Sequence, residues 1–138
     1  MLESEREGYR LPDDEIIRVR RYNRCVAVGS LELFERDPEI FKRIHRISRL
    51  AGKKLYIILL GDATPSRWAR VFRDHLATNI DVAIRIYEVR EISSLEKLLK
   101  DLCDRNTLLF LEKREELIEY ANREKLSEKC NIILFEKK

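Results

Sequence analysis

The segment Leu55–Leu60 is apolar at every position, which is typical of a β-strand covered on both faces. Thr107–Leu111 has the same character, and Cys25–Ser30 is an apolar run that stops at a glycine just before a helical pattern. Strands of this kind occur in parallel sheets, because crossover helices cover both sides of such a sheet. The sequence therefore predicts an α/β fold.

Helical patterns separate these predicted strands. Asp37-Pro38 and Thr64-Pro65 each predict a helix start, because Asp and Thr cap exposed amides and Pro suits the first turn. Ser93 to Glu96 predicts a capping box before a third helix, and residues 112–128 predict a charged last helix with no good N-cap. Residues 31–36 are expected to form a loop.

Two more strands complete the predicted sheet. Residues 80–89 alternate between apolar and polar side chains, which indicates a strand at a sheet edge, and Asn131–Phe135 is a final apolar strand. The alternation of strands and helices predicts a doubly wound, five-stranded parallel sheet in the order 3-2-1-4-5, with helices on both faces. We expect residues 23–138 to form this single domain and residues 1–22 to be a polar tail or an extra edge strand.

The amino-acid composition limits the kinds of protein that this chain could be. Charged residues make up 38% of the 138 residues, and glutamine is absent, which favours a thermophilic source. The net charge is only +3, and no apolar run approaches the roughly 20 residues of a membrane span. The three cysteines, Cys25, Cys103 and Cys130, form no CxxC pair and have no nearby histidine at metal-ligand spacing. We therefore expect a cytoplasmic protein with reduced, buried cysteines and with no metal or cofactor.

The last strand predicts an interface. Ile132, Ile133, Leu134 and Phe135 would lie at the border of the predicted sheet, where an apolar strand invites pairing. Either residues 16–19 or a second copy of the chain could cover this border. We favour a homodimer in which the last strands meet across a two-fold axis.

One local cluster of basic residues precedes the first strand. It consists of Arg18, Arg20, Arg21 and Arg24. A charged edge that discourages strand addition is the simpler interpretation. A contact with an anion or a nucleic acid is the alternative, and it predicts binding that weakens steeply with salt.

The order and lengths of these segments resemble the universal stress protein family over residues 25–136. The resemblance includes the helix end Leu50-Ala51-Gly52 and the cysteine-led final strand at Cys130. ATP-binding members place an acidic residue near the end of strand 1 and a loop of the type Gly-x2-Gly-x9-Gly-Ser/Thr after strand 4. Here strand 1 ends in Val28-Gly29-Ser30, and strand 4 runs into residues 112–116, which contain no glycine. A backbone without glycine cannot easily approach a triphosphate.

The resemblance implies a non-catalytic module that acts in stress response or regulation through dimer or partner contacts, without binding ATP. A ligand, if any, would lie at the carboxyl ends of strands 1 and 4. The residues there are Gly29, Ser30, Glu112, Lys113 and Arg114, of which Lys113 or Arg114 could attract a small anion. The alternatives are a cytosolic regulatory domain of a membrane transporter, a nucleotide-binding or nucleotide-hydrolysing enzyme of related fold, and a nucleic-acid-associated protein.

Overall fold

A computed structural model describes residues 22–51, 54–61, 64–78 and 82–135. It contains one five-stranded sheet in the order β3-β2-β1-β4-β5, and all neighbouring strands run parallel. The strands are β1 (Arg24–Ser30), β2 (Lys54–Leu60), β3 (Ala83–Val89), β4 (Thr107–Glu112) and β5 (Asn131–Phe135). The predicted α/β class and strand order are therefore confirmed.

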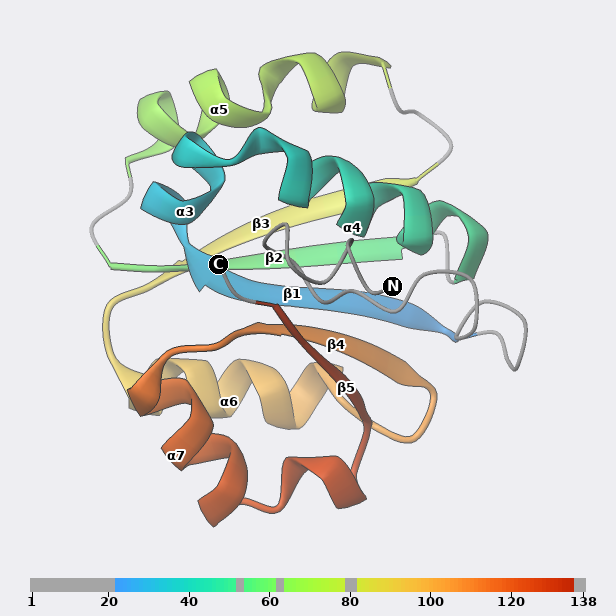
Figure 1. Cartoon of the computed structure of the whole chain (residues 1–138), viewed down its shortest axis with the longest axis vertical. Helices are drawn as coiled ribbons and strands as arrows, with labels where there is room; N and C mark the ends of the chain where they lie inside the picture. The colour runs from blue at the N-terminus through green and yellow to red at the C-terminus, as the bar shows by residue number, and fades with distance from the viewer. Residues whose placement is uncertain (1–21, 52–53, 62–63, 79–81, 136–138) are drawn as a thin grey trace, which may run out of the picture.

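Helices cover both faces of this sheet (Figure 1). One layer contains α3 (Leu31–Arg36), α4 (Pro38–Ala51) and α5 (Pro65–Thr78); the other contains α6 (Ile92–Leu102), α7 (Glu115–Arg123) and the 3-10 turn η1 (Leu126–Glu128). Cys25 and Ala27 belong to the core on the α3–α5 side, whereas Val26 and Val28 belong to the core on the α6–α7 side. This alternation explains why the central strands are apolar at every position.

Four phenylalanines join the first helical layer to the border strand β5. The ring centroids of Phe41 and Phe72 are 4.8 Å apart, those of Phe34 and Phe72 are 5.5 Å apart, and those of Phe34 and Phe135 are 6.4 Å apart. All four side chains are essentially inaccessible to solvent. Such aromatic contacts add to the free energy gained from burial, so this cluster fixes α3, α4 and α5 against one face of the sheet.

The expected loop at residues 31–36 is instead the short helix α3. Ser30 caps it, because the hydroxyl of Ser30 accepts a 3.2 Å hydrogen bond from the backbone N–H of Leu33. Leu33 and Phe34 are buried, and an ion pair between Glu32 and Arg36 lies on the exposed side. The prediction was wrong because the apolar residues of one turn are too few to show a helical period.

The helices on the other face differ from their predicted bounds. The backbone enters α6 after Glu91, which makes no side-chain cap, so Ser93 lies inside the first turn and the predicted capping box is wrong. The predicted last helix over residues 112–128 is also wrong, since it divides into α7 and η1. Lys125 has φ 54, a left-handed conformation that ends helical hydrogen bonding.

The two border strands differ in character. β3 carries exposed Arg85 and Glu88 and is an edge strand, as predicted, although residues 80 and 81 of the expected strand lie outside the described residues. β5 contains no charged residue. The expected tail at residues 1–21 lies outside the described residues too. No helix within the described ranges has the length and apolar character needed to span a lipid bilayer.

Candidate functional site

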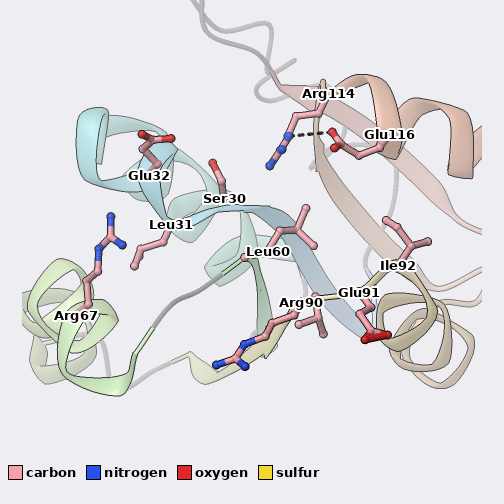
Figure 2. A pocket seen from close by; sticks show the side chains of 12 residues that line it. Ser30, Leu31, Glu32, Leu60, Arg67, Arg90, Glu91, Ile92, Arg114 and Glu116 are labelled. Carbon is pink, nitrogen blue, oxygen red and sulfur yellow. Dashed lines mark ion pairs between the residues drawn. The ribbon is translucent and has the colours of Figure 1, made fainter.

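A large cavity lies at the carboxyl ends of β1, β2 and β3. It has a volume of about 480 Å³. Its lining residues are Ser30, Leu31, Glu32, Leu60, Gly61, Arg67, Val89, Arg90, Glu91, Ile92, Arg114 and Glu116. The chain continues from β1 to β2 on one side of the sheet and from β4 to β5 on the other side. Ligands of open parallel sheets usually bind at the carboxyl ends of the strands where the order reverses in this way. Figure 2 shows the lining side chains.

Glu112, the last residue of β4, links the carboxyl ends of β1 and β4. Its carboxylate accepts a 2.9 Å hydrogen bond from the backbone N–H of Ser30, the first residue beyond Gly29. Burial raises the pKa of the Glu112 carboxyl, whereas the hydrogen bond from Ser30 and the charge of Arg114 act in the opposite direction. A backbone N–H at the end of the first strand can bind a phosphate, but here the N–H of Ser30 already donates to the carboxylate of Glu112.

Gly29 makes this arrangement possible. A Cβ added at Gly29 would lie 3.3 Å from Oε1 of Glu112 and 3.3 Å from Cζ of Phe135. These distances are tighter than ordinary van der Waals contacts, so a larger residue would push against both side chains. The glycine therefore admits the Glu112 carboxylate between the two strand ends.

Three arginines approach the cavity from three different elements (Figure 2). Arg67 extends from α5, Arg90 follows β3, and Arg114 precedes α7. Arg67 forms a bidentate pair with Glu35, with distances of 2.7 and 3.1 Å from its guanidinium nitrogens to the carboxylate oxygens. The hydrogen bond from Arg67 holds the pKa of Glu35 below its ordinary value.

Acidic side chains balance these arginines. Nε of Arg114 lies 3.2 Å from Oε1 of Glu116, and the lining also includes Glu32 and Glu91. The lining thus contains three arginines and three glutamates, and the carboxylate of Glu112 accepts a hydrogen bond from the N–H of the lining residue Ser30. The floor between them is apolar and consists of Leu31, Leu60, Val89 and Ile92. This balance of charge disfavours a highly charged ligand such as a triphosphate.

Only two of the five residues predicted to form the ligand crevice line the cavity. Ser30 and Arg114 line the cavity, and Gly29 and Glu112 lie next to it at the strand junction. Lys113 is exposed and does not line it; its backbone N–H donates a 2.8 Å hydrogen bond to the carbonyl of Phe135. Sequence reasoning missed Arg67 and Arg90. The position of Arg90 directly after a predicted strand was a usable signal, whereas nothing in the sequence indicated that Arg67 would face the same cavity.

Of the predicted basic cluster, only Arg24 can be placed. Nη1 of Arg24 donates a 2.7 Å hydrogen bond to the carbonyl of Leu102 and lies 3.7 Å from a carboxylate oxygen of Asp104. Arg24 thus holds the end of α6 against the start of β1, at the opposite end of the strands from the cavity. Arg18, Arg20 and Arg21 lie outside the described residues.

The four predicted interface residues of β5 point to opposite sides of the sheet. Ile133 and Phe135 are buried in the core against the α3–α5 layer. Ile132 is half-buried and Leu134 is 38% exposed. The last two line an apolar groove of about 250 Å³ whose other lining residues are Leu111, Ile118, Ala121, Asn122 and Ser127. A contact at this border would therefore involve Leu134 and the strand backbone rather than Ile133 or Phe135.

Fold and cavity together define an open, all-parallel α/β domain with a mixed-charge cavity at its strand ends. Within the described ranges, no group of three or more His, Cys, Asp or Glu side chains could hold a metal ion. A search of protein-family models finds none that matches the chain, and comparisons with curated proteins and with solved structures find no significant match.

Proposed function

We propose that this protein is a non-catalytic regulatory module, similar to the universal stress proteins, that acts as a homodimer and does not use ATP. The observation that carries the proposal is the hydrogen bond from the N–H of Ser30 to the carboxylate of Glu112. It places negative charge at the strand junction where a phosphate-binding member of that family would need amides and glycines. The three lining glutamates offset the three lining arginines, and Glu112 adds negative charge at the strand junction, which disfavours a triphosphate.

The character of β5 supports the homodimer. Its five residues carry no charge, it lies at the border of the sheet, and Leu134 is the one large apolar side chain among those described that is clearly exposed. The other border strand, β3, carries Arg85 and Glu88, as protected edges do. Two copies of β5 meeting antiparallel across a two-fold axis would pair the open backbone and bring the two apolar grooves together.

The test of the homodimer is the molar mass in solution by sedimentation equilibrium. The wild-type chain is expected to be a dimer. Leu134→Asp should shift the equilibrium to the monomer with an unchanged circular dichroism spectrum, because a carboxylate would be buried in the paired groove. Ala83→Asp, which places the same charge on the exposed part of β3, is the matched control and should remain dimeric. A monomeric wild type, or an unchanged mass for Leu134→Asp, would contradict the proposal.

The cavity supports a second candidate function, the binding of a small ligand that has one anionic group and an apolar part. Its arginines reach a floor made of Leu31, Leu60 and two further apolar side chains, and its volume of about 480 Å³ suits a small metabolite. AMP, adenosine and ATP can be compared as probes by thermal shift. This function predicts stabilisation by AMP above that by ATP or adenosine, lost in Arg114→Gln and kept in Arg123→Gln, which lies outside the cavity. Equal shifts in melting temperature with the three probes would contradict this second function.

A further inference from the structure

Two cysteines that are distant in the sequence belong to the same core, on the α6–α7 side of the sheet. Cys103 is the C-cap of α6, and Cys130 directly precedes β5. The pairing of Leu108 in β4 with Asn131 in β5 brings the two chain segments together. Cys103 lines a cavity together with Leu126 and Lys129, and Cys130 directly follows Lys129 and hydrogen-bonds to the carbonyl of Leu126, so the two thiols are neighbours; both are reduced. The third cysteine, Cys25, is buried in the core on the other side of the sheet.

The two thiols differ in access to solvent. Cys130 is 6% exposed, and its Sγ donates a hydrogen bond of 3.6 Å to the carbonyl of Leu126. Cys103 is only partly buried and lines a cavity of about 180 Å³. The other residues around this cavity are Leu99, Lys100, Tyr120, Glu124, Leu126 and Lys129. A small oxidant can therefore reach the sulfur of Cys103 through this cavity, whereas the sulfur of Cys130 is buried.

The two thiols differ in their tendency to ionise. The interaction between the two thiols lowers the pKa of Cys130 and raises that of Cys103, so Cys130 ionises before Cys103 does. Lys129 favours the thiolate on Cys130 and Arg24 favours it on Cys103, while Asp104 opposes both. Tyr120, whose pKa is raised to about 12 by burial, stays neutral. A thiolate is the nucleophile in thiol oxidation.

We propose that Cys103 and Cys130 form a dithiol site that reacts with a small hydroperoxide and closes to an intramolecular disulfide. The sulfur of Cys103 attacks the terminal oxygen, so that an S–O bond forms while the O–O bond breaks, and the alkoxide leaves and takes a proton from water. Cys103 reacts after its proton has passed to the Cys130 thiolate, so this proton is on Cys130 during the attack. Cys130 then attacks the sulfenic acid of Cys103: the S–S bond forms, the S–O bond breaks, and hydroxide leaves with the thiol proton as water. Two thiols are oxidised and one peroxide is reduced to an alcohol and water.

The disulfide would join the end of α6 to the start of β5. The loop that it closes contains β4 and α7, which pack on this face of the sheet. Closing such a loop restricts the unfolded chain and should raise the melting temperature. The dithiol is independent of the proposed dimer, because it depends on contacts within one protomer.

The experiment treats the full, reduced chain with equimolar hydrogen peroxide, then denatures it and labels it with N-ethylmaleimide for intact mass and peptide mapping. The expected product carries one label, on Cys25, and a cross-linked peptide pair containing Cys103 and Cys130. Cys25→Ala should form the same cross-link and carry no label. Cys103→Ser should form none. The melting temperature of the wild type should rise by about 5–10 °C on oxidation, and that of Cys103→Ser should not.

Three outcomes would overturn the dithiol site. The first is full labelling of all three cysteines after exposure to peroxide. The second is a disulfide between chains instead of within one chain. The third is a melting temperature that rises equally in Cys103→Ser. As a check that needs no oxidation, a trivalent phenylarsenical, which bridges two neighbouring thiols, should bind reduced Cys25→Ala and fail to bind Cys103→Ser. Equal binding to both variants would also contradict the proposal.

Discussion

The backbone N–H of Ser30 donates a 2.9 Å hydrogen bond to the carboxylate of Glu112, which joins the ends of two parallel strands that are 82 residues apart in the sequence. The absent side chain of Gly29 leaves the space for this carboxylate. The charge at this junction comes from the end of β4, where a phosphate-binding loop would need glycines instead. Glu112 thus contributes both a hydrogen bond and a negative charge at the strand junction next to the cavity.

Replacing Glu112 by Gln should stabilise the protein at neutral pH. Burial raises the pKa of Glu112 from 4.5, so the favourable contribution of its protonated form is fully present below pH 4.5 and is lost as the pH rises through the folded-state pKa. Because the carboxyl is partly solvated, the expected gain at pH 7 is only about 0.5 kcal/mol. Urea unfolding at pH 7 and pH 3.5 measures it. An equal effect at the two pH values would show that charge is not the cause.

Two glycine substitutions should destabilise the fold for different reasons. Gly29→Ala would place a methyl group 3.3 Å from Glu112 and from Phe135, which we expect to cost about 1 kcal/mol. Gly61→Ala meets no atom within 4 Å but must adopt φ +99, which costs about 1–2 kcal/mol. Combining Gly29→Ala with Glu112→Ala should relieve part of the first cost and none of the second. A double-mutant cycle with no coupling between positions 29 and 112 would refute the steric account.

Truncation of two neighbouring residues of β5 should destabilise the protein to very different extents. Phe135 is fully buried and its ring lies 6.4 Å from that of Phe34, so Phe135→Ala should lower the free energy of unfolding by about 3–4 kcal/mol. Leu134 is 38% exposed, so Leu134→Ala should cost less than about 1 kcal/mol in the separated protomer. Denaturant unfolding at a protein concentration low enough to dissociate a dimer compares the two. Similar losses would mean that the faces of β5 are assigned incorrectly.

Alkaline pH should weaken the core through Cys25. Burial raises the pKa of this thiol from 9.0 to about 11, while a hydrogen bond with Ser48 acts in the opposite direction. The neutral thiol is thus favoured in the folded state, and its contribution is complete below pH 9 and lost as the pH rises towards 11. The wild type should lose roughly 2–3 kcal/mol more than Cys25→Ala across this interval. Parallel pH profiles for the two proteins would contradict this assignment.

The strand order was predictable from the sequence because burial on both faces leaves a direct signature. Leu55–Leu60 and Thr107–Leu111 are apolar throughout and lie inside the sheet, whereas the alternating segment that ends at Val89 lies at an edge. Helix bounds were less predictable. The cap at Ser30 begins a helix of only 6 residues, and the left-handed Lys125 ends α7 without a glycine to mark the position.

The site was only partly predictable, because its residues come from separate elements. Ser30 and Glu112 follow from the rule that ligands bind at strand ends, and the same rule would have found Arg90. The approach of Arg67 depends on how α5 packs against α3, where Arg67 pairs with Glu35. The contact between Cys103 and Cys130 depends likewise on tertiary packing, which the sequence separation of the two residues conceals.

Native mass spectrometry of the wild-type chain with excess Mg²⁺-ATP tests the central claim most directly, because one spectrum reports both the number of chains and any bound nucleotide. The account predicts the mass of two chains with no nucleotide attached, and the mass of a single chain for Leu134→Asp. A species that retains ATP would contradict the role assigned to Glu112, and a wild-type monomer at micromolar concentration would contradict the role assigned to β5.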